Sequence, residues 1–255
     1  MTDSHIHVGQ YFSIYSNPLA IKSFLDSVGV GRFAVSSTTT CNEDFHKVVD
    51  EIKRLKELCG DRVLPVLWVL PKMFKDVDNT LGVLMDSGID WRCLKIHPQL
   101  HPEVWSKDDS PEMKWVIRLS RTLNCPILIH SGEMPGCYPS LFANTFKDNA
   151  DRTFILAHGR PIKDTVDIMA VCPNVWVDTA FMPIYHIVEL CKTGFVDRIL
   201  WGTDYPIPKH FYPDMDMIDY YMGLVAELKR SVSEEDFEKI THKNFERLFG
   251  EVKGV

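Results

Sequence analysis

Residues 127–130, Ile127-Leu-Ile-His130, form one of four short segments in which an apolar run ends in a side chain that can bind a metal ion. The others are Asp3-Ser-His5-Ile-His7, Phe154-Ile-Leu-Ala-His158 and Ile199-Leu-Trp-Gly-Thr-Asp204. Runs of Ile, Leu and Val that are buried on both faces are typical of parallel sheets. Alternate side chains of a strand share a face, so we expect His5 and His7 to point the same way. These segments therefore predict parallel strands with metal ligands at their tips.

Eight strand-like runs occur along the chain, at residues 2–7, 32–37, 63–70, 92–97, 126–130, 153–158, 174–178 and 198–203. Most of the intervals between them have the apolar periodicity of helices. Strands that alternate with helices predict an α/β fold with a parallel sheet, and eight such units allow the sheet to close as a (β/α)8 TIM barrel. The 255 residues suit one barrel, so we expect a single domain that spans residues 1–255.

Helix boundaries can also be predicted from end signals. Asn42 can cap a helix whose apolar residues repeat at helical spacing from Phe45 to Leu58, and Gly60 can end it. Another helix is expected to start at Ser110-Pro111-Glu112. It is expected to end at Leu123-Asn124.

An extra helix is expected at the C-terminus. Ser233, with Asp236 three residues later, is a helix-start signal. One face of this helix would carry four apolar side chains, those of Phe237, Ile240, Phe245 and Leu248. We expect that face to pack against the exterior of the barrel.

The composition excludes several classes of protein. A formal net charge of -7 and a pI near 5.8 argue against a nucleic-acid partner, because such proteins concentrate positive charge. The seven cysteines have no Cys-x-x-Cys spacing and are expected to be reduced thiols of a cytosolic protein. No apolar stretch is long enough to cross a bilayer. We therefore expect a cytoplasmic protein with a small-molecule substrate and no membrane partner.

Barrel geometry brings the scattered motif residues together, because active sites of TIM barrels lie at the C-terminal ends of the strands. The ordered set of motifs resembles the amidohydrolase superfamily, in particular the amidohydrolase-related branch that includes aminocarboxymuconate-semialdehyde decarboxylase. The resemblance covers the whole chain, through Asp3-Ser-His5-Ile-His7, Ile129-His130-Ser131-Gly132, Leu156-Ala-His158-Gly159, Trp201-Gly-Thr-Asp204-Tyr-Pro206 and Asn244-Phe-Glu-Arg-Leu-Phe-Gly250. The ordered set is specific, whereas any single motif would not be.

This resemblance implies a role for each motif residue. His5, His7, His130 and Asp204 would bind the metal, and His158 would stay beside it as an acid/base group or electrophile. Imidazole and carboxylate ligands suit Zn²⁺, so we expect one zinc ion, or another divalent metal, per chain. The metal would activate a water molecule for attack on a carbonyl, with His158 or Asp204 moving the proton.

Three basic residues near the same strand ends are candidates for substrate binding. Some binuclear amidohydrolases carry a carboxylated lysine on the fourth strand, but we favour contact between Lys95 and a substrate carboxylate. A structural salt bridge from Lys95 to Asp178 is the alternative. His97 shares the face of Lys95 and lies nearer the rim, and Arg160, which follows His158-Gly159, is the best carboxylate clamp among the loop residues.

Other polar and aromatic residues admit structural explanations. Asp178, at the end of the seventh strand, could orient a ligand histidine or could cap the next helix. Four of the six tryptophans are expected to pack in the core or at an interface; these are Trp68, Trp105, Trp176 and Trp201.

Three functions are compatible with these residues. The first is a metal-dependent hydrolase that opens a lactone, ester or amide in a small carboxylated molecule. The second is a non-hydrolytic decarboxylase that uses the same site, and the third is a non-catalytic protein that retains the metal. A deoxyribonuclease of the TatD type is less favoured, because the fourth strand lacks an acidic ligand. Barrels of this branch often pair, so a homodimer is compatible with the resemblance, although the sequence does not determine the oligomeric state.

Overall fold

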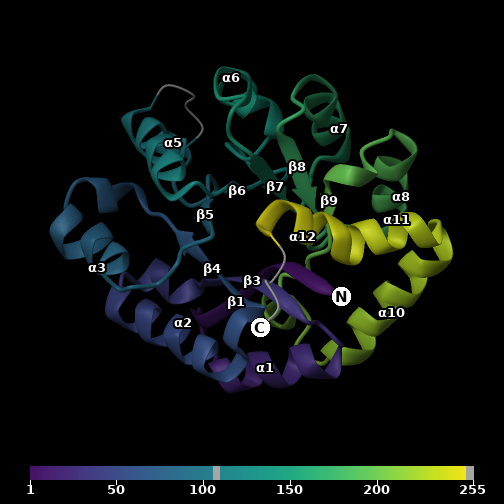
Figure 1. The fold of residues 1–255 in the computed structure, drawn as a ribbon, viewed down its shortest axis with the longest axis horizontal. Coiled ribbons are helices and arrows are strands. Elements are labelled where there is room, and N and C mark those ends of the chain that lie inside the picture. Colours follow the sequence, from purple (N-terminus) through teal and green to yellow (C-terminus); the bar gives the residue numbers. More distant parts are fainter. Residues whose placement is uncertain (106–109, 251–255) are drawn as a thin grey trace.

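The strands form a closed ring. The computed structural model describes residues 1–105 and 110–250, and within them nine strands are hydrogen-bonded in the order β2-β1-β3-β4-β5-β6-β7-β8-β9. The amide of Ser4 donates to the carbonyl of Trp201 at 2.8 Å, and that of His7 donates to Tyr205 at 2.7 Å. The first barrel strand therefore pairs with the segment that follows β9, and the (β/α)8 barrel closes (Figure 1).

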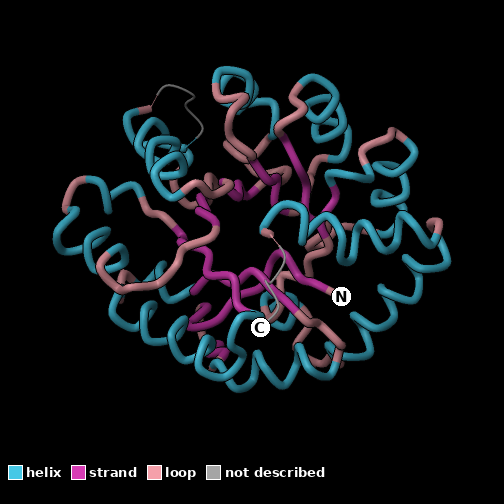
Figure 2. Tube along the Cα trace, viewed as in Figure 1, coloured by secondary structure: helices cyan, strands magenta, loops and turns pink. Residues whose placement is uncertain are grey.

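Helices surround the strands on the outside (Figure 2). The strands are β1 (Thr2–Tyr11), β2 (Ile14–Ser16), β3 (Arg32–Ser37), β4 (Val63–Trp68), β5 (Cys93–Ile96), β6 (Ile127–His130), β7 (Phe154–Ala157), β8 (Val175–Asp178) and β9 (Ile199–Leu200). The α-helices are α1 (Pro18–Ser27), α2 (Phe45–Cys59), α3 (Gly82–Met85), α4 (Pro102–Trp105), α5 (Pro111–Leu123), α6 (Ala143–Asp148), α7 (Ile162–Val171), α8 (Ile184–Lys192), α9 (Ile207–Phe211), α10 (Met217–Ser231), α11 (Glu234–Glu238) and α12 (Asn244–Phe249).

All eight predicted strands are present and parallel, which confirms the predicted barrel. The sequence did not predict β2. Strand β1 leaves the barrel after Val8 pairs with Ser37, continues to Tyr11 and turns back to form an antiparallel hairpin with β2. The predicted domain of residues 1–255 includes 106–109 and 251–255, which lie outside the described residues.

One predicted helix start is wrong. The N-cap of α2 is Asp44, whose side chain accepts from the amide of Lys47 at 3.1 Å, whereas Asn42 ends a short 3-10 turn over Thr38–Asn42. Asparagine and aspartate are both good N-caps. Because Asn42 is still part of the 3-10 turn, the helix starts two residues later, after Asp44. The caps predicted for α5 are confirmed, because Ser110 accepts from the amide of Met113 at 3.0 Å and Asn124 is left-handed.

The barrel interior has an apolar lower part and a polar upper part. Alternation along β5 and β6 sends Cys93 and Leu128 into the lower part. Two residues further along the same strands, Lys95 and His130 lie at the C-terminal ends. The outward side chains of the strands, for example Val177, pack against the helices in the larger core cluster.

The C-terminal helical segment closes the lower end of the barrel, which corrects the prediction that it covers the exterior. Ser233 caps α11 as predicted, and a π-helical stretch, Lys239–Lys243, joins α11 to α12. Phe245 and Phe249 of α12 belong to the same buried cluster as the interior residues Leu64 and Leu128. Aromatic side chains therefore form the floor of the barrel.

Among the residues that the structure describes, no helix is both long and apolar enough to span a membrane.

Candidate metal centre

Three donor atoms converge at the C-terminal ends of the first and last barrel strands. Asp204 Oδ1 lies 3.3 Å from Nε2 of His5 and 3.1 Å from Nε2 of His7. Tetrahedral zinc, with bonds of about 2.0–2.1 Å, holds its ligand atoms about 3.3–3.4 Å apart. The three residues are at most 4% exposed and form one of two groups in the described residues that could hold a metal ion. Their spacing and chemistry therefore fit a zinc ion.

Both histidines of the donor set are held through their other ring nitrogen. His5 Nδ1 lies 2.9 Å from Oδ2 of Asp178, and His7 Nδ1 lies 2.9 Å from the hydroxyl oxygen of Ser36 and 3.3 Å from its carbonyl oxygen. Because a carboxylate or carbonyl oxygen can only accept a hydrogen bond, and the hydroxyl can accept one as well, Nδ1 donates in both rings and Nε2 keeps its lone pair. Burial lowers the pKa of both histidines well below the ordinary value, which also favours neutral rings. Carboxylate and carbonyl partners of this kind usually orient metal-binding imidazoles.

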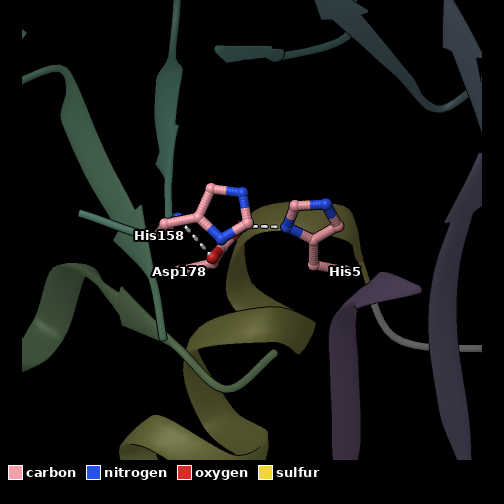
Figure 3. A group of neighbouring side chains, drawn as sticks. All are labelled: His5, His158 and Asp178. Atoms are coloured by element: carbon pink, nitrogen blue, oxygen red, sulfur yellow. Dashed lines mark hydrogen bonds and ion pairs between the residues drawn. The ribbon is translucent and has the colours of Figure 1, made fainter. Parts of the chain in front are cut away.

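Asp178 links this donor set to His158. Its Oδ1 accepts from the amides of His158 at 2.9 Å and Ala180 at 3.1 Å, while Oδ2 contacts His5 (Figure 3). His5, His158 and Asp178 form the second group that could hold a metal ion in the described part of the chain. The helix-cap explanation for Asp178 is wrong, because α8 begins at Ile184 after Pro183. Asp178 orients His5.

The His158 ring is fixed at both nitrogens. Nδ1 lies 3.1 Å from the carbonyl oxygen of Ala180, so Nδ1 donates and Nε2 accepts from Nδ1 of His130 at 3.1 Å. Burial lowers the pKa of His158 to about 4, against the opposing effect of Asp204. The ring is therefore neutral at pH 7 and has a lone pair at Nε2.

His130 lies beyond His158 rather than within the donor set. It belongs to neither metal-binding group among the described residues. Its ring stacks on His97 with centroids 3.8 Å apart, and His97 stacks on Trp68 at 5.4 Å. The structure thus brings His5, His7 and Asp204 together, while a ligand role for His130 stays a prediction.

Lys95 lies inside this cluster. Its Nζ atom is 2.9 Å from Nε2 of His5 and 3.1 Å from Nε2 of His7, so the lysine contacts these imidazoles rather than forming the alternative salt bridge with Asp178. Burial lowers its pKa to about 8, and Asp204 and Asp178 oppose this shift.

Three buried nitrogen atoms around the cluster have no hydrogen-bond partner in the described part of the chain: Nε1 of Trp68, Nδ1 of His97 and Nε of Arg160. The indole of Trp68 packs 4.6 Å from Nζ of Lys95 and 5.8 Å from the ring of His7. Trp68 belongs to the buried core cluster, as expected, and its indole also lies beside the candidate site. Arg160 makes one long contact, 3.9 Å from Nη1 to Glu133.

Comparison with known proteins identifies the family of this chain. The family model for amidohydrolases matches residues 3–250. The chain belongs to the amidohydrolase family. Among curated proteins no match was found.

Solved structures share the barrel of this amidohydrolase. One is a probable 2-pyrone-4,6-dicarboxylic acid hydrolase from Acinetobacter baumannii with citric acid bound (TM-score 0.69, 14% identity, 98% of this chain and 99% of that chain covered). Another is 5-carboxyvanillate decarboxylase from Sphingomonas paucimobilis (0.66, 10%, 98% and 98%). A third is the apo form of IDCase from Metarhizium anisopliae (0.67, 14%, 94% and 80%). At these identities the likeness shows the fold alone.

The sequence reasoning missed two residues that support the amidohydrolase site. Asp3 accepts from the hydroxyl of Thr203 at 2.6 Å and from the amide of His5 at 3.0 Å, so it joins β1 to the loop that carries Asp204. Burial raises its pKa to about 7, despite these hydrogen bonds. Ser36 contacts Nδ1 of His7 through its hydroxyl at 2.9 Å and its backbone carbonyl at 3.3 Å. Asp3 could have been noticed as an acid inside an apolar strand, whereas a single serine near the end of a strand is not a distinctive sequence signal.

Proposed function

We propose that this amidohydrolase is a zinc-dependent hydrolase that opens a lactone, ester or amide bond in a small carboxylated molecule. The observation that carries the proposal is the convergence of His5, His7 and Asp204 beside the neutral ring of His158. One ion per chain is expected, with His130 as a fourth ligand. When bound, the ion would supply positive charge that polarises a carbonyl group and activates water.

The protein residues would handle the protons. His158 Nε2 would accept a proton as general base, and the carbonyl of Ala180 would stabilise the imidazolium through Nδ1. Asp178 is buried and accepts from the amide of His158, so its charge also favours that imidazolium. Asp204 is the second candidate to move the proton.

The buried nitrogen atoms that lack hydrogen-bond partners in the described part of the chain suit a ligand rich in oxygen atoms. A buried donor without an acceptor costs about 1–3 kcal/mol, and a substrate carboxylate would relieve that cost. We assign substrate binding to Lys95, His97 and Arg160, with Trp68 as a further donor. The Acinetobacter and Sphingomonas relatives are both named for carboxylated substrates, which supports this substrate class.

Decarboxylation is the second candidate. The residues around Lys95 are almost wholly buried, with His7 at 3% and His158 at 4% exposure. A carboxylate that is desolvated in such a site loses hydration that stabilises its charge, which favours loss of CO₂. A metal would serve in either reaction.

The test is turnover of a panel of lactones, esters, amides and carboxylated aromatics by zinc-loaded protein, with acid release and CO₂ release followed separately. Acid release that is lost in Asp204→Asn and kept in the control Asp90→Asn, at the opposite end of the barrel, supports the hydrolase. CO₂ release with the same dependence favours the decarboxylase. Zinc binding without turnover of any compound would favour the non-catalytic protein.

A further inference from the structure

The ammonium group of Lys95 uses the lone pairs that a metal ion needs. An ammonium can only donate, so Nε2 of His5 and Nε2 of His7 accept from it at 2.9 and 3.1 Å. Their Nδ1 atoms donate to Asp178 and Ser36, which leaves one lone pair on each ring. Each lone pair can serve either Lys95 or a metal, and not both.

A bound metal would therefore leave Lys95 without its hydrogen-bond acceptors. The side chain is 2% exposed, so water cannot readily replace them. Its other close contact is the indole face of Trp68, 4.6 Å from Nζ. Two cations would then lie close together in a buried space. Asp204 would offset part of their repulsion, but its charge would be shared with the metal, so a further anion beside Lys95 would be stabilised.

Two residues beside Lys95 carry nitrogen atoms that could donate to such an anion. Trp68 Nε1 and His97 Nδ1 are buried without partners in the described part of the chain, and both rings belong to the stack beside Lys95. A carboxylate could accept from Lys95 and from one of these nitrogens. We take the anion to be a carboxylate because the proposed substrates are carboxylated molecules.

We propose that a metal ion and a carboxylate ligand bind cooperatively through Lys95, which donates to His5 and His7 before the metal binds and to the carboxylate afterwards. The inference rests on the proposed metal site. By thermodynamic linkage each ligand strengthens the other by the same factor, and couplings of about 5- to 150-fold are typical.

The experiment measures zinc affinity at one fixed pH by competition with a chromophoric chelator. It compares wild type, Lys95→Met and the control Lys163→Met, whose lysine side chain is 87% exposed. Each protein is measured in carboxylate-free buffer, with acetate as the smallest carboxylate, and with acetamide as its uncharged analogue. Acetate's own weak affinity for zinc affects all three proteins equally.

In carboxylate-free buffer Lys95→Met should bind zinc at least about tenfold more tightly than wild type, because the competing ammonium is gone. Acetate should raise the zinc affinity of wild type and of Lys163→Met, but not that of Lys95→Met, and acetamide should change none of them.

Equal zinc affinity of wild type and Lys95→Met would overturn the inference while leaving the metal site intact. A second zinc equivalent that depends on bicarbonate and is lost in Lys95→Met would also overturn it, because Lys95 would then be a carboxylated ligand. Absence of zinc binding in all three proteins would instead contradict the proposed function. Thermal unfolding of each metal-free protein verifies that the variants are folded.

Discussion

Two polar residues of the site adopt a backbone conformation that is unfavourable for them. His158 has φ 69° and Asp204 has φ 57°, both in the left-handed region. That region costs most residues about 1–2 kcal/mol, and such costs concentrate at functional positions. The left-handed turn redirects each side chain at the point where its strand ends. The strain therefore marks the same two residues that we assign to proton transfer.

His158→Asn tests the proton-transfer role without adding strain, because asparagine tolerates the left-handed region. Zinc should stay bound, and kcat should fall by about 10²–10⁴, the usual effect of removing a general acid/base group. Steady-state kinetics and zinc analysis measure both effects, with His46→Asn on the exposed face of α2 as the control. Loss of zinc from His158→Asn would make this residue a ligand, and unchanged kcat would exclude it from proton transfer.

The residue after His158 has no room for a side chain. A Cβ on Gly159 would lie 2.3 Å from Cγ2 of Val177 and 2.6 Å from Cε of Met182, at φ +51°. Gly194 has φ +84° and nothing within 4 Å, so Gly194→Ala adds backbone strain alone. In urea unfolding, the free energy of unfolding should fall by about 1–3 kcal/mol more in Gly159→Ala than in Gly194→Ala, because the added methyl group overpacks the site. Equal losses would mean that Val177 and Met182 move aside freely.

At the scale of elements, the β1–β2 hairpin depends on a buried carboxylate. Glu51 of α2 is 3% exposed and accepts from the hydroxyls of Ser37 at 2.6 Å and Thr39 at 3.0 Å. Gly9 lies against these same groups, where a Cβ would be 2.6 Å from Oε2 of Glu51. The network fixes the point at which β1 leaves the barrel, just beyond His7.

Burial raises the pKa of Glu51, despite the hydrogen bonds from Ser37 and Thr39. The folded state therefore holds this proton more tightly than the unfolded state, whose carboxyl titrates near 4.5. Stability from this group is present below that value and is lost as pH rises to the raised pKa. The unfolding free energy of Glu51→Gln relative to wild type should rise with pH above 4.5, by at most about 1.4 kcal/mol per pH unit, and then level off. A difference that does not vary with pH, as expected for the exposed Glu57→Gln, would contradict this.

Sequence patterns predicted the strands better than their surroundings. Apolar runs predict strands such as β3, whose predicted and observed bounds are the same. The convergence of the candidate ligands His5, His7 and Asp204 could be predicted because each residue ends or lies within such a run. The contact of Lys95 with two imidazoles could not, since it depends on side chains from different strands meeting in the barrel. Strand β2 was missed because three residues are too few to give a pattern.

At the scale of the whole molecule, the residues that pack the floor of the barrel and the residues of the candidate metal centre lie at opposite ends of the barrel. Phe245 of α12 is 1% exposed and packs in the floor, at the end opposite to the metal centre. Phe245→Ala should therefore lower the unfolding free energy by about 3–5 kcal/mol while leaving zinc affinity unchanged. Chemical denaturation and chelator competition measure the two effects. Phe211→Ala is the control, because Phe211 is 57% exposed. If Phe245→Ala also lowered zinc affinity, the floor and the metal centre would not be independent.

The closure of the barrel by its first and last strands also bears on how the protein is made. Asp3 and Thr203 bind each other across 200 positions, and the donors His5 and Asp204 are just as remote along the chain. At about 5–20 residues per second, a ribosome needs roughly 10–40 s between these two ends. A nascent chain that stops at residue 198 should thus hold no zinc. The ion is expected to enter only after synthesis has delivered the last strand, so a growing polypeptide cannot use the metal to guide its early folding.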